Sequence, residues 1–122
     1  MWPKPRWSDG RAAVPTLYTG PQGAVGQFVA KCLYSHSGPD DPIVLPGLPG
    51  RSHSHDFYGA TGAGANSTPR TLAGKSSTCD KPGDDAAYWQ PTLYDHAVRI
   101  VPLEAHAYYR AAPGVDPYDV RP

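Results

Sequence analysis

Prolines and glycines recur throughout this chain at intervals that leave little room for long regular elements. Fifteen prolines and thirteen glycines stand among 122 residues, and they are densest in the double turn at residues 46–50. Proline interrupts helices and sheet ladders, and both residues favour turns, so this spacing favours short strands with long connections. The sequence shows no repeat and no long amphipathic helix. Aromatic residues persist throughout, which favours a folded, loop-rich domain over a disordered chain.

Alternating apolar residues mark the predicted strands. In residues 26–34 every second position is apolar, so these side chains share one face that we expect to be buried. They are Phe28, Ala30, Cys32 and Tyr34. Residues 35–39 are a predicted turn. Residues 97–102 and 105–110 are predicted strands, with Asp95 and His96 as the turn before the first of them.

The chain is predicted to have three parts. Residues 1–22 carry four prolines and two tryptophans, which is typical of an extended arm that docks on the domain or on a neighbouring chain. Residues 23–112 form the β-rich domain, and residues 113–122 form a flexible tail. The predicted fold class is mainly β: a short-stranded, loop-rich, sandwich-like domain with one disulfide and extended arms at both ends.

Charge and hydropathy exclude two classes of partner. Eleven basic and eleven acidic residues give no formal net charge, whereas nucleic-acid binding usually needs a clustered basic surface. No apolar run approaches the length of a membrane span. We therefore expect neither nucleic acid nor a membrane span.

The two cysteines bear on the compartment. An even count in a lysine-poor chain rich in Gly, Pro and Tyr favours one disulfide, between Cys32 and Cys79, in an exported protein. The alternative is two unrelated buried thiols. The first residues lack the apolar core of a signal peptide, so either an export signal has been removed or the chain is cytoplasmic. We expect an extracellular protein.

The segment at residues 51–59 is the strongest candidate for chemistry. In an extended segment His53 and His55 point the same way, and two imidazoles on one side of a strand can share a divalent metal such as zinc. Asp56 can ligate the ion or orient a ring. A third ligand would come from His36 or His96, with His106 and Asp80 as further candidates. The alternative is a polar loop whose rings bond backbone carbonyls.

Two other sets of residues suggest binding or modification. Tyr58, Tyr88 and Trp89 can form an aromatic platform for sugar rings, although core packing is the simpler explanation for Trp89. Asn66 begins a three-residue acceptor pattern for N-glycosylation. The same region can instead begin a short helix at Pro69 that ends at Gly74.

Several segments together carry a resemblance. Ordered along the chain they are residues 28–36, 40–50, 52–59, 67–72, 78–79 and 88–94. They resemble, from about Gln27 to Tyr109, a secreted fungal and actinobacterial family of domains of unknown function, numbered nineteen ninety-six. The resemblance implies export and a Cys32–Cys79 bridge, and it marks the segment around His55 as the family motif, but it supplies no reaction.

The resemblance covers only the N-terminal half of such a domain. Family members usually continue for a further segment of comparable length, with more cysteines and a second histidine-bearing segment. Where the family has Asn after the motif glycine, this chain has Ala60. A metal site completed by the later histidines would therefore be incomplete here.

Three functions remain open from the sequence. The expectation is an extracellular module that binds a polysaccharide or cell-surface glycan, or that assembles with copies of itself. The alternative is a metal-dependent hydrolase acting on a glycan or phosphoester, in which the ion bound at His53 and His55 activates water. No Ser-His-Asp order recommends a covalent mechanism.

Overall fold

The computed structural model describes residues 15–21 and 23–122. Its regular structure there is mostly strand, in chain order β1 (Thr16–Gly20), β2 (Gly23–Gly38), β3 (His55–Gly59), β4 (Ala87–Pro91), β5 (Leu93–Asp95), β6 (Val98–Ile100) and β7 (Glu104–Arg110). Within the same residues, helical structure is limited to α1 (Pro69–Leu72) and the 3-10 turn η1 (Pro117–Asp119). The mainly β prediction is confirmed. Of the predicted N-terminal arm, residues 1–14 and 22 lie outside the described residues, and β1 comes from the rest.

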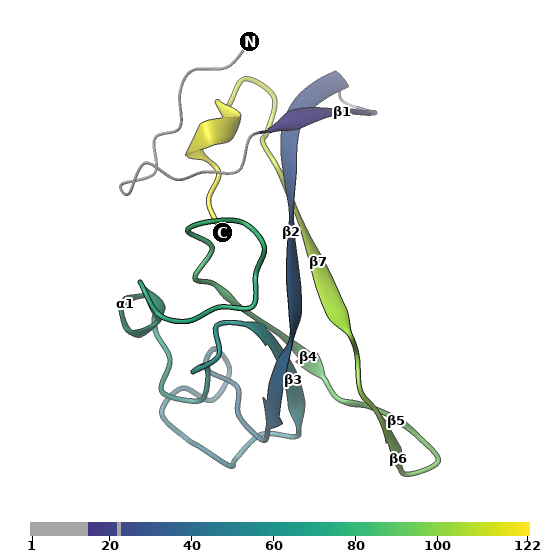
Figure 1. The fold of residues 1–122 in the computed structure, drawn as a ribbon, viewed down its shortest axis with the longest axis vertical. Coiled ribbons are helices and arrows are strands. Elements are labelled where there is room, and N and C mark those ends of the chain that lie inside the picture. Colours follow the sequence, from purple (N-terminus) through teal and green to yellow (C-terminus); the bar gives the residue numbers. More distant parts are fainter. Residues whose placement is uncertain (1–14, 22) are drawn as a thin grey trace.

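Strand β2 organises the main sheet. It pairs antiparallel first with β1, then with β7 over residues 27–33, and finally with β3, which pairs in turn with β4. Figure 1 shows β2 and β7 running side by side as a long ribbon, with β3 and β4 near its lower end. The sheet is therefore open, and its two ends are joined by one continuous strand.

The prediction of a turn at residues 35–39 is wrong, because β2 continues through Gly38. His36 and Ser37 instead pair with Phe57 and Asp56, and the register slips between Tyr34 and His36, so that a β-bulge absorbs one residue. Ser and His have little strand preference of their own. Pairing with β3 decides their conformation, and such tertiary override of strand propensity is common.

The core is small and lies on both faces of the sheet. Of the predicted buried face of β2, Phe28, Ala30 and Cys32 are buried, while Tyr34 is half-buried. Tyr58 of β3 joins Ala30 and Cys32, and a second cluster on the other face gathers around Phe57. With so few large apolar side chains buried, covalent linkage has more to contribute to stability than it would in a larger domain.

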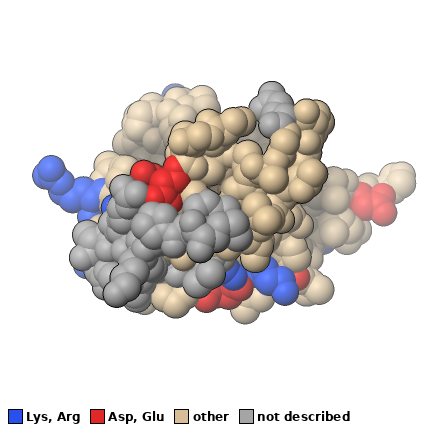
Figure 2. Space-filling model, turned by 90° about the horizontal axis from the view of Figure 1, so that it is seen from above, with Lys and Arg blue, Asp and Glu red and all other residues tan. Residues whose placement is uncertain are grey.

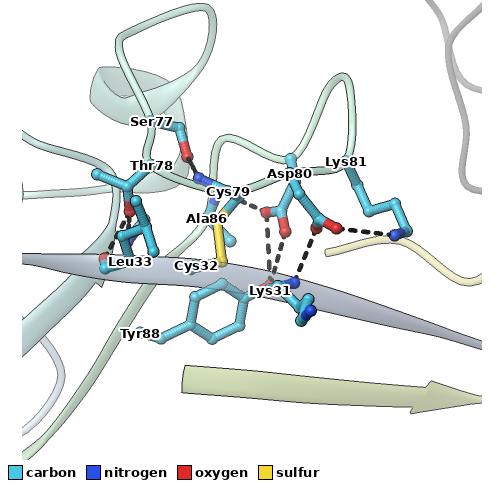
Figure 3. The surroundings of a disulfide bond; sticks show 12 residues. Lys31, Cys32, Leu33, Ser77, Thr78, Cys79, Asp80, Lys81, Ala86 and Tyr88 are labelled. Atoms are coloured by element: carbon cyan, nitrogen blue, oxygen red, sulfur yellow. Dashed lines mark hydrogen bonds and ion pairs between the residues drawn. A yellow bond between two sulfur atoms is a disulfide. The ribbon is translucent and has the colours of Figure 1, made fainter. Parts of the chain in front are cut away.

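The disulfide between Cys32 and Cys79 is formed, with an S–S distance of 2.05 Å. Figure 3 shows that it fastens the loop before β4 to strand β2. On one side of it the Lys31 and Asp80 backbones are joined, and on the other the Thr78 hydroxyl donates to the Leu33 carbonyl at 2.6 Å. The loop thus follows β2 on both sides of the sulfur–sulfur bond.

The same loop carries a buried carboxylate, that of Asp84. Asp84 is buried, accepts the Ala86 amide at 3.1 Å and accepts the Tyr88 hydroxyl at 3.2 Å. The Tyr88 hydroxyl also meets that of Tyr109 from β7. Burial raises the pKa of Asp84 above its usual range, because the charged carboxylate loses hydration there. These hydrogen bonds link β4 to β7 across the loop.

The β5–β6 hairpin projects from the body of the molecule (Figure 1). Its turn lies one residue later than predicted, at His96 and Ala97, which both have positive φ (48° and 66°). Two-residue hairpin turns of this hand match the twist of the strands. All six strand residues of the hairpin are exposed. The predicted strand at 105–110 is confirmed as β7.

The short helix offered as the alternative at Pro69 is formed as α1, but it ends at Leu72 with Ala73 as its C-cap, before the predicted end at Gly74. Thr68 caps it, and Thr68 and Thr71 bond reciprocally as a capping box. Toward the end of the chain, residues 113–122 were predicted to be a flexible tail. This segment contains η1, with Tyr118 buried and Val120 packed against Phe28.

Charged side chains are scattered over the visible face in Figure 2, with no broad patch of either sign among the residues described there. Within the described residues, no helix is long and apolar enough to cross a membrane.

Loss of the disulfide should lower the free energy of unfolding. The bridge closes a loop with a sequence separation of 47 residues, which corresponds to about 4 kcal/mol in the chain-entropy model. We expect the Cys32→Ala/Cys79→Ala double variant to unfold at much lower urea concentration than the parent. Urea titration followed by circular dichroism measures this. Equal midpoints would contradict a structural role for the bond.

Candidate functional site

Strand β3 places the motif side chains on two opposite faces. All five of its residues are buried, and it lies between β2 and β4. Because side chains alternate along a strand, His55 and Phe57 face one side, while Asp56 and Tyr58 face the other. The two polar motif residues, His55 and Asp56, therefore belong to different environments.

The first face holds the histidines. The rings of His53 and His55 lie beside each other, with centroids 4.6 Å apart. His55 Nδ1 lies 2.9 Å from the Asp40 carbonyl oxygen, and its Nε2 lies 3.9 Å from Asp41 Oδ2. Asp41 Oδ1 accepts the amides of Ile43 and Val44. The Val44 amide contributes most to lowering the pKa of Asp41, so this carboxylate stays ionised.

His36 is engaged on the same face. Its ring stacks on Phe57 at 4.9 Å with nearly parallel planes. Its Nε2 lies 2.7 Å from the Ala63 carbonyl oxygen and its Nδ1 lies 2.8 Å from the Ser35 hydroxyl. Both ring nitrogens thus have partners within the protein, which leaves no lone pair of His36 directed at His55.

The second face holds Asp56 in a network of hydroxyls. Its Oδ1 accepts the Ser37 hydroxyl at 2.6 Å, the Thr92 hydroxyl at 3.1 Å and the Arg99 guanidinium at 3.2 Å. Its Oδ2 is buried and has no hydrogen-bond partner among the residues that the structure describes. Asp56 is 0% exposed. It is therefore a buried carboxylate in which one oxygen accepts all of the hydrogen bonds described above.

Arg99 reaches this network from the projecting hairpin. Its Nη2 also donates to the Tyr34 hydroxyl at 2.7 Å and contacts the Ser37 hydroxyl. The hydrogen bond and the electrostatic interaction with Tyr34, followed by the charge of Asp56, raise the pKa of the guanidinium. Next to the network, burial raises the pKa of Tyr58, whose hydroxyl accepts from the Gln90 amide at 2.8 Å. Among the described residues, Arg99 is thus the positive side chain paired with the buried carboxylate of Asp56.

The structure does not bring His53, His55 and Asp56 together around one point. Among residues 15–21 and 23–122, the one group of three His, Cys, Asp or Glu ligand atoms within 4.8 Å of one another is Cys32, Cys79 and Asp84. Its two sulfurs are consumed by the disulfide. Metal binding by the predicted set stays a prediction.

The remaining candidate ligands lie apart. His96 is at the hairpin turn beside Asp95, at 2.6 Å, and His106 pairs with Glu104 on β7 at 2.9 Å. Asp80 bonds the backbone of Lys31 beside the disulfide. The glycosylation candidate Asn66 is exposed.

The proposed aromatic platform is divided between the two faces of the sheet. Tyr58 pairs with Tyr88 in the register, and Phe57 pairs with Trp89. Tyr58 is buried and Tyr88 is half-buried in the cluster around the disulfide. Trp89 packs against Phe57 at 5.9 Å on the other face. Of the three, Trp89 lines a surface pocket.

This pocket has a volume of about 510 Å³ and lies between α1, the start of β4 and the last two residues. Its walls are mostly apolar, with polar groups from Thr68, Asp85 and Arg121. That composition is typical of small-molecule sites. Sequence reasoning missed it, because its walls come from segments far apart in the chain.

Sequence reasoning also missed Arg99, Ser37 and Asp41 as site residues. Arg99 has the alternation of an exposed strand residue, and Ser37 was placed in a turn. The only signal was the Asp-x-x pattern after Asp41, typical of a side chain that bonds backbone amides two and three residues on.

Fold and site together define a mainly β, disulfide-bonded domain whose central strand displays a histidine on one face and a carboxylate on the other. The chain belongs to the family DUF1996, described as a domain of unknown function, whose model matches residues 41–118. The comparisons with curated proteins and with solved structures gave no match.

Arg99 should stabilise the fold through Asp56. Removing the guanidinium leaves a buried carboxylate without its positive partner, which is strongly unfavourable. We expect Arg99→Ala to lower the urea midpoint in the parent, and to have a much smaller effect in an Asp56→Asn background. A double-mutant cycle by urea denaturation measures the coupling.

Arg70→Ala removes an exposed arginine of α1 and is the control. It should have little effect in either background. An equal effect of Arg99→Ala with and without the Asp56 charge would contradict the coupling.

Proposed function

We propose that the protein is an exported extracellular module that binds glycans in the pocket lined by Trp89. The observation that carries this proposal is the pocket itself, a largely apolar hollow with an indole in its wall and a few polar groups around it. Sugar rings combine apolar C–H faces with hydroxyl groups, so they suit such a lining. The disulfide supports export, since such bonds persist in oxidising compartments.

The indole is held in place from two sides. It packs against Phe57, and its hydrogen bond with Asp41 is among the causes of the lowered pKa of that carboxylate. A ring fixed in this way loses little conformational entropy on binding. Trp89 can thus offer a pre-formed apolar surface to a sugar ring.

Polar groups in the pocket wall can bind the hydroxyl groups of a sugar. Asp85 uses Oδ2 to accept the Gly74 amide at 2.8 Å, which fixes its carboxylate at the pocket. Arg121 also lines the pocket. Carboxylates accept from sugar hydroxyls and guanidinium groups donate to them. The pair can therefore orient a sugar that stacks on Trp89.

Filling the pocket should abolish glycan binding without disturbing the fold. Ala73 is an exposed lining residue just after α1, so Ala73→Tyr places a ring in the hollow. We expect this variant to lose binding to insoluble polysaccharides such as cellulose, xylan or chitin, and Trp89→Phe to weaken it. Pull-down followed by calorimetry with the matching soluble oligosaccharide measures both.

Ala112→Tyr is the matched control, because Ala112 is exposed and does not line this pocket. It should bind like the parent. Unchanged binding by Ala73→Tyr would exclude this pocket, and no binding of the parent to any polysaccharide would contradict the glycan proposal.

Self-association is a second candidate, favoured by the β5–β6 hairpin. Leu93, Val98 and Leu103, in and just after it, are 62%, 64% and 85% exposed. Exposed apolar clusters commonly mark interaction sites. The chain carries no formal net charge that would keep copies apart.

A charged residue on the hairpin should therefore reduce association. We expect the parent to show a concentration-dependent increase in mass by light scattering, and Val98→Glu to remain monomeric. Val44→Glu is the control, because Val44 is 70% exposed elsewhere on the surface and does not line the pocket. A monomeric parent at all concentrations would exclude this candidate.

A further inference from the structure

One hydrogen bond determines which nitrogen of His55 carries the proton. Its Nδ1 lies 2.9 Å from the Asp40 carbonyl oxygen and 3.4 Å from the Ser52 hydroxyl. A carbonyl oxygen can only accept, so Nδ1 is the donor. In the neutral ring the lone pair is then on Nε2. Metal-binding histidines are usually fixed in this way, with the far nitrogen donating to a carbonyl or carboxylate.

The lone pair of His55 faces a carboxylate oxygen. Asp41 Oδ1 accepts the amides of Ile43 and Val44, both at 3.0 Å, and Oδ2 lies 3.9 Å from His55 Nε2. That separation is too long for a hydrogen bond. The two side chains are only 5% and 13% exposed. Two acceptors this close in a largely buried site are unfavourable unless a positive charge lies between them.

The separation suits a transition metal ion. Zinc binds imidazole nitrogen and carboxylate oxygen at about 2.1 Å each, so one ion can span up to about 4.2 Å. A tetrahedral angle at the ion needs about 3.4 Å, a closure of about half an ångström. Asp41 sits in a loop and His55 at the first position of β3, so a shift of this size need not break the sheet pairing.

His53 is the natural third ligand. Its ring lies against that of His55, with centroids 4.6 Å apart, and the residue is exposed. A rotation about its side-chain bonds is needed to direct a nitrogen at the ion, and an exposed ring can make such a rotation at low cost. Two imidazoles and one carboxylate suit zinc, copper or nickel and leave a fourth position for water.

We propose that His55, Asp41 and His53 form a binding site for a divalent transition metal ion such as Zn²⁺. The carboxylate ligand is Asp41, on the same face as the two rings, and not Asp56, which serves the Arg99 network on the opposite face. The site is independent of the proposed glycan pocket, although Trp89 contacts Asp41 and borders both.

The test is titration of the chelator-stripped full chain with Zn²⁺ by calorimetry. The parent should bind one equivalent, and its thermal midpoint should rise with added zinc. Asp41→Asn keeps the shape of the side chain and an acceptor for the two loop amides, and His53→Ala changes an exposed residue. Each should weaken binding by about tenfold or more.

Two controls separate this site from other ways of binding zinc. Asp56→Asn and His96→Ala should bind like the parent, with the fold of every variant checked by circular dichroism. If Asp41→Asn does not fold, His53→Ala decides. The proposal is overturned if the parent binds no zinc, or if Asp56→Asn weakens binding while Asp41→Asn does not. It is also overturned if His96→Ala abolishes zinc binding.

Discussion

The burial of strand β3 between β2 and β4 is the constraint on which the rest of the structure depends. Its five residues include a histidine and an aspartate, and neither reaches water freely. Buried polar groups must find partners within the protein. The loop at residues 40–44 provides a hydrogen-bond acceptor for His55, and the hydroxyl groups and Arg99 donate hydrogen bonds to Asp56. Much of the polar arrangement around the sheet follows from these two needs.

The bulge in β2 helps to provide a hydrogen-bond partner for the buried Asp56. By absorbing one residue between Tyr34 and His36, it sets the Ser37 hydroxyl opposite Asp56 while the His36 ring stacks on Phe57. Without the bulge, the residues of β2 after Tyr34 would shift by one position against β3, and each of their side chains would lie on the opposite face of the sheet. The bulge therefore allows one strand to satisfy an apolar ring on one face and a carboxylate on the other.

Local patterns predicted the parts of the fold that local forces determine. The buried face at Phe28, Ala30 and Cys32, the capped helix at Pro69 and the strand at 105–110 follow from alternation and capping, and the cysteine pair follows from composition. The extension of β2 depends on β3, and the role of Arg99 depends on a hairpin folding back to residues 43 positions earlier. Neither leaves a local pattern. The motif was found, but alternation between His55 and Asp56 divides it between two faces.

The pairing of β2 with β7 also has a consequence for how the chain folds. The side chains of Gln27 and Arg110, bonded to each other in the finished sheet, are separated by 83 residues. Such distant pairing makes folding slow, because a long loop must close before the contact forms. During synthesis, the edge of β2 that pairs with β7 stays unpaired until residues 104–110 have been made. Unpaired strand edges of this kind can pair with other chains and so promote aggregation.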